Sequence, residues 1–100
     1  MKVDIQSIHF VADRKLLDFI NRKLEKVRTF SDNIKSADVY LRLEKDIEKE
    51  NKAVEVKINL NGNPIFAKEN ANTFETATDI VLDKLVAQVK RHKERTQAKV

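Results

Sequence analysis

Basic and amide side chains recur near the end of the sequence at a spacing that places them on one side of a helix. At 3.6 residues per turn, four of them fall on one narrow stripe, which we call the basic ridge: Lys84, Gln88, Arg91 and Arg95. Asp79, Asp83 and Glu94 fall on a different stripe, across the apolar face. A solvated helix usually mixes the two signs to gain pairs one turn apart, and separate stripes forgo that gain. The pattern therefore favours a surface that binds a polyanion such as nucleic acid over a merely solvated face.

A weaker basic stripe occurs earlier in the chain. Lys15, Arg22 and Lys26 share one side of a second predicted helix, and Lys23 lies at the border with its apolar side. Phe19 lies close to this stripe; it could stack on a base, but the edge of a hydrophobic core is the favoured interpretation. Each Lys or Arg that meets a phosphate releases condensed counterions, which makes binding strong and salt-dependent. No base-reading pattern is visible, so we expect recognition of RNA shape and backbone.

The distribution of charge agrees with these two stripes. The whole chain has a net charge of +4 and a pI of about 9.4. Residues 13–30 hold six Lys or Arg and three acidic residues, and residues 84–100 hold six and one. Residues 32–72, in contrast, hold seven basic and eight acidic residues. The positive excess therefore lies in the two segments that carry the stripes.

Catalytic chemistry finds little support in the sequence. His9 and His92 are isolated, the chain has no cysteine, and a single glycine makes a phosphate-binding glycine loop improbable. The acidic residues of 44–50 alternate with lysines in a predicted loop, so we interpret them as solubilising and not as a metal site. We predict no enzyme, no catalytic residue, no metal and no cofactor. A small-molecule substrate is likewise not expected as a partner. A membrane is not expected either, because no apolar run of 18 residues exists.

Two predicted helices carry the basic stripes. The first begins at the N-cap Asp13, and its apolar side chains recur at helical spacing: Leu16, Ile20, Leu24 and Val27. Ser31-Asp32-Asn33 then predicts a turn. The second helix, over residues 73–95, starts with Thr73 as its cap and meets no helix breaker. Its length predicts that the last turns project beyond the sheet.

Alternating apolar residues predict four strands. They cover residues 2–8, residues 39–43, residues 54–60 and a short segment over 65–68. Asn61-Gly62 predicts a tight turn, and Pro64 favours an edge position for the last strand.

This element order is β-α-β-β-β-α, which predicts the α+β class. We expect a two-layer sandwich in which two helices pack on one face of a four-stranded sheet, with the first two strands parallel if they are adjacent. Residues 1–96 form the single predicted domain, for binding RNA or the ribosome, and residues 97–100 a C-terminal tail.

The order and the basic helix resemble a known family. The segment FETATDIVLDKLVAQVKRHKERT is similar to the closing helix of the ribosome hibernation promoting factor and ribosome-associated inhibitor A family, in its short form. INLNGNPIFAKENANTFETA resembles the third strand, turn, fourth strand and helix entry of that family, and FINRKLEKVRTFSDNI the end of its first helix. Residues that stand at matching places in the closing helix are Asp79, Asp83, Lys84, Leu85, Gln88, Arg91, Lys93 and Arg95. Ala87 and Glu75 depart from the family pattern, since relatives often carry Arg and an aromatic there.

The resemblance implies a function. Members bind the small ribosomal subunit in the mRNA channel, across the tRNA A and P sites, and inhibit translation in stress or stationary phase without being enzymes. Their layout is similar to that of double-stranded RNA-binding domains. We therefore expect a cytoplasmic, ribosome-associated protein whose partners are the small subunit and its ribosomal RNA, with an accessory hibernation factor as a further candidate. The stripes and the resemblance together predict nine RNA-binding residues: Lys15, Arg22, Lys23, Lys26, Lys84, Gln88, Arg91, Lys93 and Arg95.

Two alternatives remain open from the sequence. One is a general double-stranded RNA-binding module without preference for the ribosome. The other is a protein-interaction module that uses an exposed sheet edge.

Overall fold

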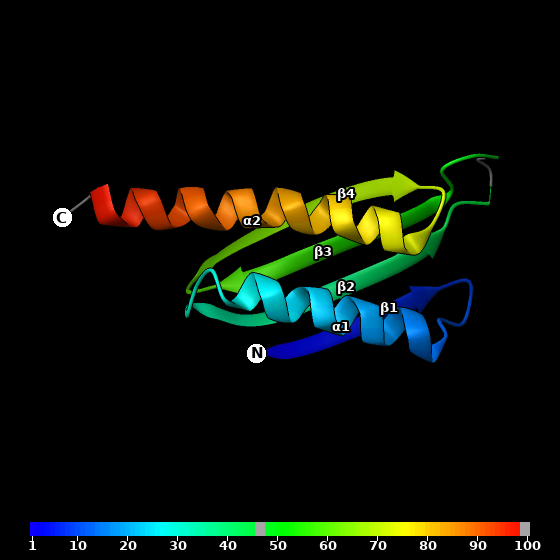
Figure 1. Ribbon diagram of the computed structural model, residues 1–100, viewed down its shortest axis with the longest axis horizontal. Coiled ribbons are helices and arrows are strands. Elements are labelled where there is room, and N and C mark those ends of the chain that lie inside the picture. Colours follow the sequence, from blue (N-terminus) through cyan, green and yellow to red (C-terminus); the bar gives the residue numbers. More distant parts are fainter. Residues whose placement is uncertain (46–47, 99–100) are drawn as a thin grey trace.

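Four strands and two helices follow one another in the order expected from the sequence. The computed structural model describes the backbone of residues 1–45 and 48–98, and the side chains of residues 1–45 and 48–91. The elements, shown in Figure 1, are β1 (Lys2–Ile8), α1 (Arg14–Arg28), β2 (Ile34–Leu43), β3 (Lys52–Leu60), β4 (Asn63–Ala71) and α2 (Phe74–Ala98). The predicted α+β class and the order β-α-β-β-β-α are confirmed.

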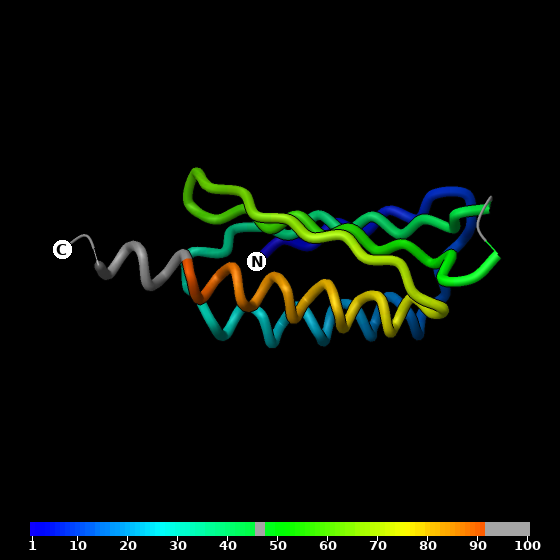
Figure 2. Tube along the Cα trace, turned by 90° about the horizontal axis from the view of Figure 1, so that it is seen from above, coloured from blue at the N-terminus to red at the C-terminus, as the bar shows by residue number. Residues whose placement is uncertain are grey.

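The strands form one sheet in chain order, β1-β2-β3-β4. β1 and β2 are parallel, as expected for neighbours joined through a helix, and the other two pairs are antiparallel. Both helices cover the same face of the sheet and run in the same direction, so the molecule has two layers (Figures 1 and 2). Within the described residues, the opposite face of the sheet carries no helix (Figure 2).

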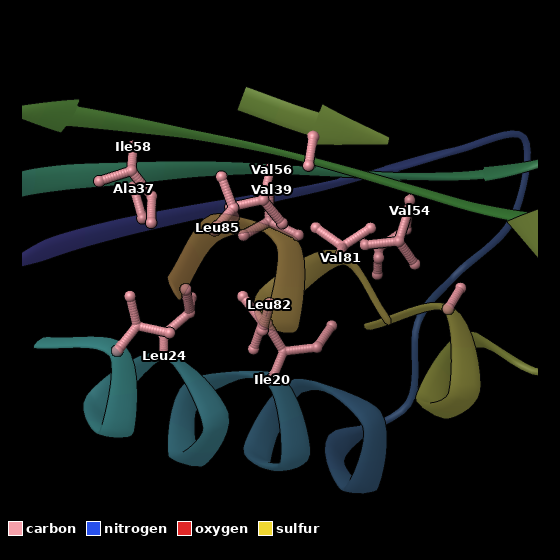
Figure 3. Packing of buried hydrophobic residues seen from close by; sticks show 14 of the residues in the cluster. Ile20, Leu24, Ala37, Val39, Val54, Val56, Ile58, Val81, Leu82 and Leu85 are labelled. Carbon is pink, nitrogen blue, oxygen red and sulfur yellow. The ribbon is translucent and has the colours of Figure 1, made fainter. Parts of the chain in front are cut away.

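The core lies between these two layers. Val39, Val56 and Ile58 of the sheet are almost completely buried, as is Leu85 of α2. Figure 3 shows these side chains between the sheet and the helices, together with Leu82 of α2 where the two helices meet. Burying such apolar side chains is the main stabilisation available to a chain of this size.

Both helix starts are capped by the predicted residues. The backbone N–H of Leu16 donates to Oδ1 of Asp13 at 2.9 Å, and the N–H of Thr76 donates to Oγ1 of Thr73 at 3.0 Å. All four predicted apolar residues of α1 are buried: Leu16, Ile20, Leu24 and Val27. The helical stripe in the sequence therefore locates the core side of α1 correctly, and with it the side that carries the basic residues.

Three strands are longer than the sequence pattern predicts, and β3, which covers 52–60 instead of 54–60, differs least. β2 begins at Ile34, five residues before the predicted start, and β4 covers 63–71 instead of 65–68. The early part of β2 is irregular, with a register shift between Ile34 and Ser36, so its side chains do not alternate cleanly. Pairing with neighbouring strands, and not local pattern, keeps this segment extended.

The turn before β4 agrees with the prediction. Gly62 has a φ of 78°, which glycine adopts without steric cost, and β4 occupies the edge that Pro64 indicates.

Helix α2 is the longest element of the fold. Its 25 residues correspond to about 37 Å at 1.5 Å per residue, and its C-terminal end extends beyond the sheet (Figure 1). It is nevertheless not apolar enough to cross a membrane, and the same holds for the other described helix. The helix continues to Ala98, past the predicted domain boundary at residue 96, and that boundary stays a prediction.

Candidate nucleic-acid interface

The described part of the basic ridge lies on the side of α2 next to the edge strand β4. We call this side the outer flank; it comprises Lys84, Gln88 and Arg91. Nζ of Lys84 forms an ion pair with Oε2 of Glu69 on β4 at 2.7 Å. Nε2 of Gln88 donates a hydrogen bond to the backbone carbonyl of Phe66 at 3.1 Å. The side chain of Arg91, one turn further along, is exposed. The outer flank thus fastens α2 to β4 through two of its residues and presents the third to solvent.

The ion pair on the outer flank changes the acidity of Glu69. The hydrogen bond from the Lys84 ammonium lowers the pKa of the Glu69 carboxyl below its usual value, and a hydrogen bond from the Asn70 backbone N–H lowers it further. Because the Lys84 side chain remains 51% exposed, a phosphate can still reach its ammonium. Glu69 therefore competes with any anionic ligand for Lys84.

The opposite side of α2 faces α1, and we call it the inner flank. It comprises Asp79, Leu82, Asp83, Val86 and Lys90. Oδ1 of Asp79 forms an ion pair with Nζ of Lys23 on α1 at 3.0 Å, which links the two helices. Leu82 is buried beneath this pair. Nζ of Lys90 lies 5.0 Å from the ring centroid of Phe30, the residue two positions after α1, in a cation–π contact.

A groove runs between the inner flank and α1. This interhelical groove encloses about 290 Å³ and is lined by Lys23, Lys26, Val27, Phe30, Asp79, Leu82, Asp83 and Val86. Its lining is partly apolar, from Val27, Leu82 and Val86. The charged residues on the α1 side are lysines, and those on the α2 side are aspartates. The two aspartates therefore interrupt the positive surface between α1 and the outer flank, and no continuous basic face forms across the described helices.

The basic stripe of α1 borders a second hollow. This hollow encloses about 360 Å³ and is lined by Phe19, Arg22, Lys23 and Lys26. Phe19 is only partly exposed and packs against the core, which confirms the core-edge interpretation. Nζ of Lys23 lies 5.3 Å from its ring centroid. Arg22 and Lys26 are exposed on the surface of α1, and so is Lys15 in its first turn. Three predicted cations of α1 therefore present their charge to solvent.

Comparison with known proteins decides the family. The family model described as sigma 54 modulation protein / S30EA ribosomal protein matches residues 3–97. The chain belongs to this family. A ribosome hibernation promoting factor from Pseudomonas putida is 31% identical over 98 residues, which cover 98% of this chain and 92% of the relative. A ribosome hibernation promotion factor from Picosynechococcus is 30% identical, and there the match covers 99% of this chain but 52% of the relative. The resemblance stated from the sequence is confirmed.

Two solved structures share the fold seen here. The crystal structure of the Thermus thermophilus Protein Y N-terminal domain superposes with a TM-score of 0.80 at 24% identity, covering 92% of this chain and 99% of that domain. A ribosomal subunit interface protein from Coxiella burnetii gives a TM-score of 0.84 at 20% identity, covering 94% and 99%. These matches support the fold. The further likeness to double-stranded RNA-binding domains stays a prediction.

The predicted contact residues of this S30EA family member fall into three places. Lys15, Arg22 and Lys26 are exposed on α1, whereas Lys23 is half-buried and held by Asp79. Lys84, Gln88 and Arg91 form the outer flank. The side chains of Lys93 and Arg95 lie outside the described residues. None of these positions is tested as an RNA contact by the fold itself, so the set stays a prediction.

One charged residue of this S30EA family helix was missed by the sequence reasoning. Lys90 follows Asp83 by seven residues, almost two full turns, and therefore lies on the same stripe as the aspartates. The interpretation of α2 as cleanly sorted by sign is wrong at this position. The helical spacing of α2 could have placed Lys90 on the acidic stripe. The contact of Lys90 with Phe30 could not be predicted, because it depends on where α1 ends.

Proposed function

We propose that this protein is a ribosome-associated translation inhibitor that acts as a hibernation factor in the cytoplasm. It binds the small ribosomal subunit through the basic side chains of α1 and α2. It occupies the mRNA channel and the tRNA A and P sites during stress or stationary phase. Membership of the S30EA family and the names of the relatives, hibernation promoting factors and a ribosomal subunit interface protein, support this proposal.

One observation carries the proposal beyond the family. Exposed cations from both helices lie on the helical layer that covers one face of the sheet: Lys15, Arg22, Lys26, Lys84 and Arg91. Cations fixed on two rigid helices can contact several phosphates of one folded RNA without reordering the protein. The proposed partner is therefore a folded ribosomal RNA surface.

Gradient co-sedimentation tests the proposal. The protein is mixed with purified small or large subunits, and its presence in each fraction is measured at low and at high salt. We expect it to move with small subunits at low salt and to be released at high salt, because each phosphate contact adds to the salt dependence. Failure to co-sediment at low salt would contradict the proposal.

A matched pair of variants locates the contact surface. Replacing Arg22, Lys84 and Arg91 by Ala removes three exposed helix cations, and we expect the log–log salt slope to fall by roughly one for each cation that meets a phosphate. The control replaces Lys45, Lys49 and Lys57 by Ala, which removes the same charge from a loop and from β3. Equal loss of binding in both variants would mean that net charge, and not the helix surface, determines affinity.

Competition separates the two alternatives. Equal affinity for the small subunit and for an unrelated RNA duplex would favour a general double-stranded RNA-binding module. A partner bound almost independently of moderate salt, without RNA binding, would favour a protein-interaction module at the sheet edge.

A further inference from the structure

The interhelical groove combines features that phosphate binding alone does not require. The half-buried Val86 and the ring of Phe30, which is 37% exposed, give it accessible apolar surface, and the buried Val27 and Leu82 form its floor. A surface that only contacts phosphates needs neither an apolar lining nor carboxylates. The groove is open to solvent along one side and has a volume of about 290 Å³, so one planar ring system can enter it while its edges remain hydrated.

The two aspartates of the groove differ in their availability. Asp79 is engaged with Lys23 at 3.0 Å. Among the described side chains, Asp83 takes part in no ion pair, and it is exposed at the groove wall. An ionised carboxylate only accepts hydrogen bonds, and its two oxygens can accept from two adjacent donors. The Asp83 carboxylate can therefore accept hydrogen bonds from a ligand edge that presents two neighbouring donors.

Guanine is the RNA base with that edge. Its N1–H and its N2 amino group lie side by side and both donate. Adenine and cytosine place an acceptor beside the amino group, and uracil has one donor between two carbonyl oxygens. Unstacked bases in RNA are commonly recognised through this edge while their faces contact apolar or aromatic side chains.

The opposite wall of the groove supplies the complementary charge. Lys26 lines the groove from α1 and is exposed, so its ammonium can meet the phosphate of the same nucleotide. Lysines on one wall and a carboxylate on the other match a nucleotide that carries its phosphate and its donor edge at opposite ends.

We propose that the interhelical groove binds one unstacked guanine nucleotide of the bound RNA, with the Asp83 carboxylate accepting hydrogen bonds from N1–H and N2–H. The base lies against Val86 and Phe30, and Lys26 contacts its phosphate. This inference rests on the proposed function, because it assigns a base preference to the surface that meets RNA.

Fluorescence anisotropy with short single-stranded RNAs tests the inference. The probes are oligouridines that carry one central guanosine, inosine or adenosine, and inosine lacks only the N2 amino group. We expect the guanosine probe to bind roughly tenfold more tightly than the adenosine probe, with inosine between them. The methyl NMR signals of Leu82 and Val86 should shift with the guanosine probe.

The variant Asp83→Asn gives opposite expectations for base recognition and for simple electrostatics. Removing a negative charge near phosphates should leave the affinity for the adenosine probe unchanged or higher. The guanine preference should disappear, because the amide offers one acceptor beside a donor. Asp18→Asn is the matched control, since Asp18 is an exposed acid of α1 outside the groove, and it should retain the preference.

The outcomes separate this inference from the proposed function. Absence of a guanine preference in the natural protein, whether or not the oligomers bind, overturns the inference. A preference that survives Asp83→Asn overturns it as well. If co-sedimentation with small subunits persists in either case, the proposed function stands; if it fails too, both are wrong.

Discussion

The two flanks of α2 use their charged residues in different ways. On the outer flank, Lys84 and Gln88 contact the edge strand β4, and the charge of Lys84 remains half-exposed. On the inner flank, Asp79 pairs with Lys23 above the buried Leu82. Segregation of charge along a helix therefore does not mean that ion pairs are absent. The pairs form between elements instead of within the helix, and each flank has its own partner.

This difference gives the two flanks different contributions to packing. The inner flank holds the two helices together through apolar contact, with a charged pair at the surface. The outer flank contributes polar contacts to a strand edge and can exchange one of them for a ligand. We expect substitution of the buried inner-flank residue Leu82 to change stability first, substitution of the exposed Asp83 to change base preference, and substitutions on the outer flank to change the affinity for small subunits.

The largest expected effect comes from Leu82→Ala on the inner flank. Leu82 is 5% exposed, and its truncation should lower the free energy of unfolding by about 2–5 kcal/mol, because it leaves a cavity between the helices. Urea denaturation measures this change. The control is Ile80→Ala on the same helix, where the side chain is 37% exposed and the expected loss is smaller, about 1 kcal/mol. A similar loss in the free energy of unfolding for both variants would contradict the distinction between the flanks.

A smaller effect is expected from Glu69→Gln beside the outer flank. This change releases Lys84 from its ion pair, so affinity for small subunits should rise by up to about fivefold, since exposed ion pairs contribute little. Equilibrium binding at low salt measures it. Glu44→Gln serves as the control, because it removes the same charge from a pair with Lys68 at 3.9 Å, away from the helices. A decrease in affinity would show that Glu69 positions Lys84 for RNA and does not compete with it.

The smallest effect concerns the titration of Glu69. Its folded-state pKa lies below the usual value of about 4.5, chiefly because Lys84 donates to it. The pair therefore stabilises the fold above the unfolded-state pKa, and this contribution disappears as pH falls through the lowered folded-state pKa. Carbon-detected NMR should show the pKa rising toward its usual value in Lys84→Met. An unchanged pKa would mean that the Asn70 backbone contact alone sets it.

The sequence was sufficient for the fold because local patterns and packing agree. Both helix caps, the buried side of α1 and the edge position of β4 follow from residues within a few positions of one another. The early part of β2 could not be predicted in this way, since Ile34 and Ser36 are extended only through pairing with neighbouring strands.

The candidate interface was predictable in part. Helical spacing identified which side of α2 is basic, but spacing does not say which neighbour that side will meet. The contacts of Lys84 with Glu69 and of Lys90 with Phe30 join segments far apart in the chain. The groove between the helices depends on their separation, which no pattern within one helix encodes.

The arrangement of the sheet has a consequence for folding kinetics. Every strand pairs with the strand next to it in the sequence, and two of the three pairings are antiparallel between consecutive strands. The three strands from Ile34 to Ala71 can therefore form by local closure, and only the β1–β2 pairing requires the longer connection through α1. Local closure lowers the sequence separation of contacts in this part of the sheet, whereas the β1–β2 pairing raises it, which is typical of mixed α/β domains with intermediate folding rates. We expect single-exponential refolding that is slower than that of a helical bundle of the same length.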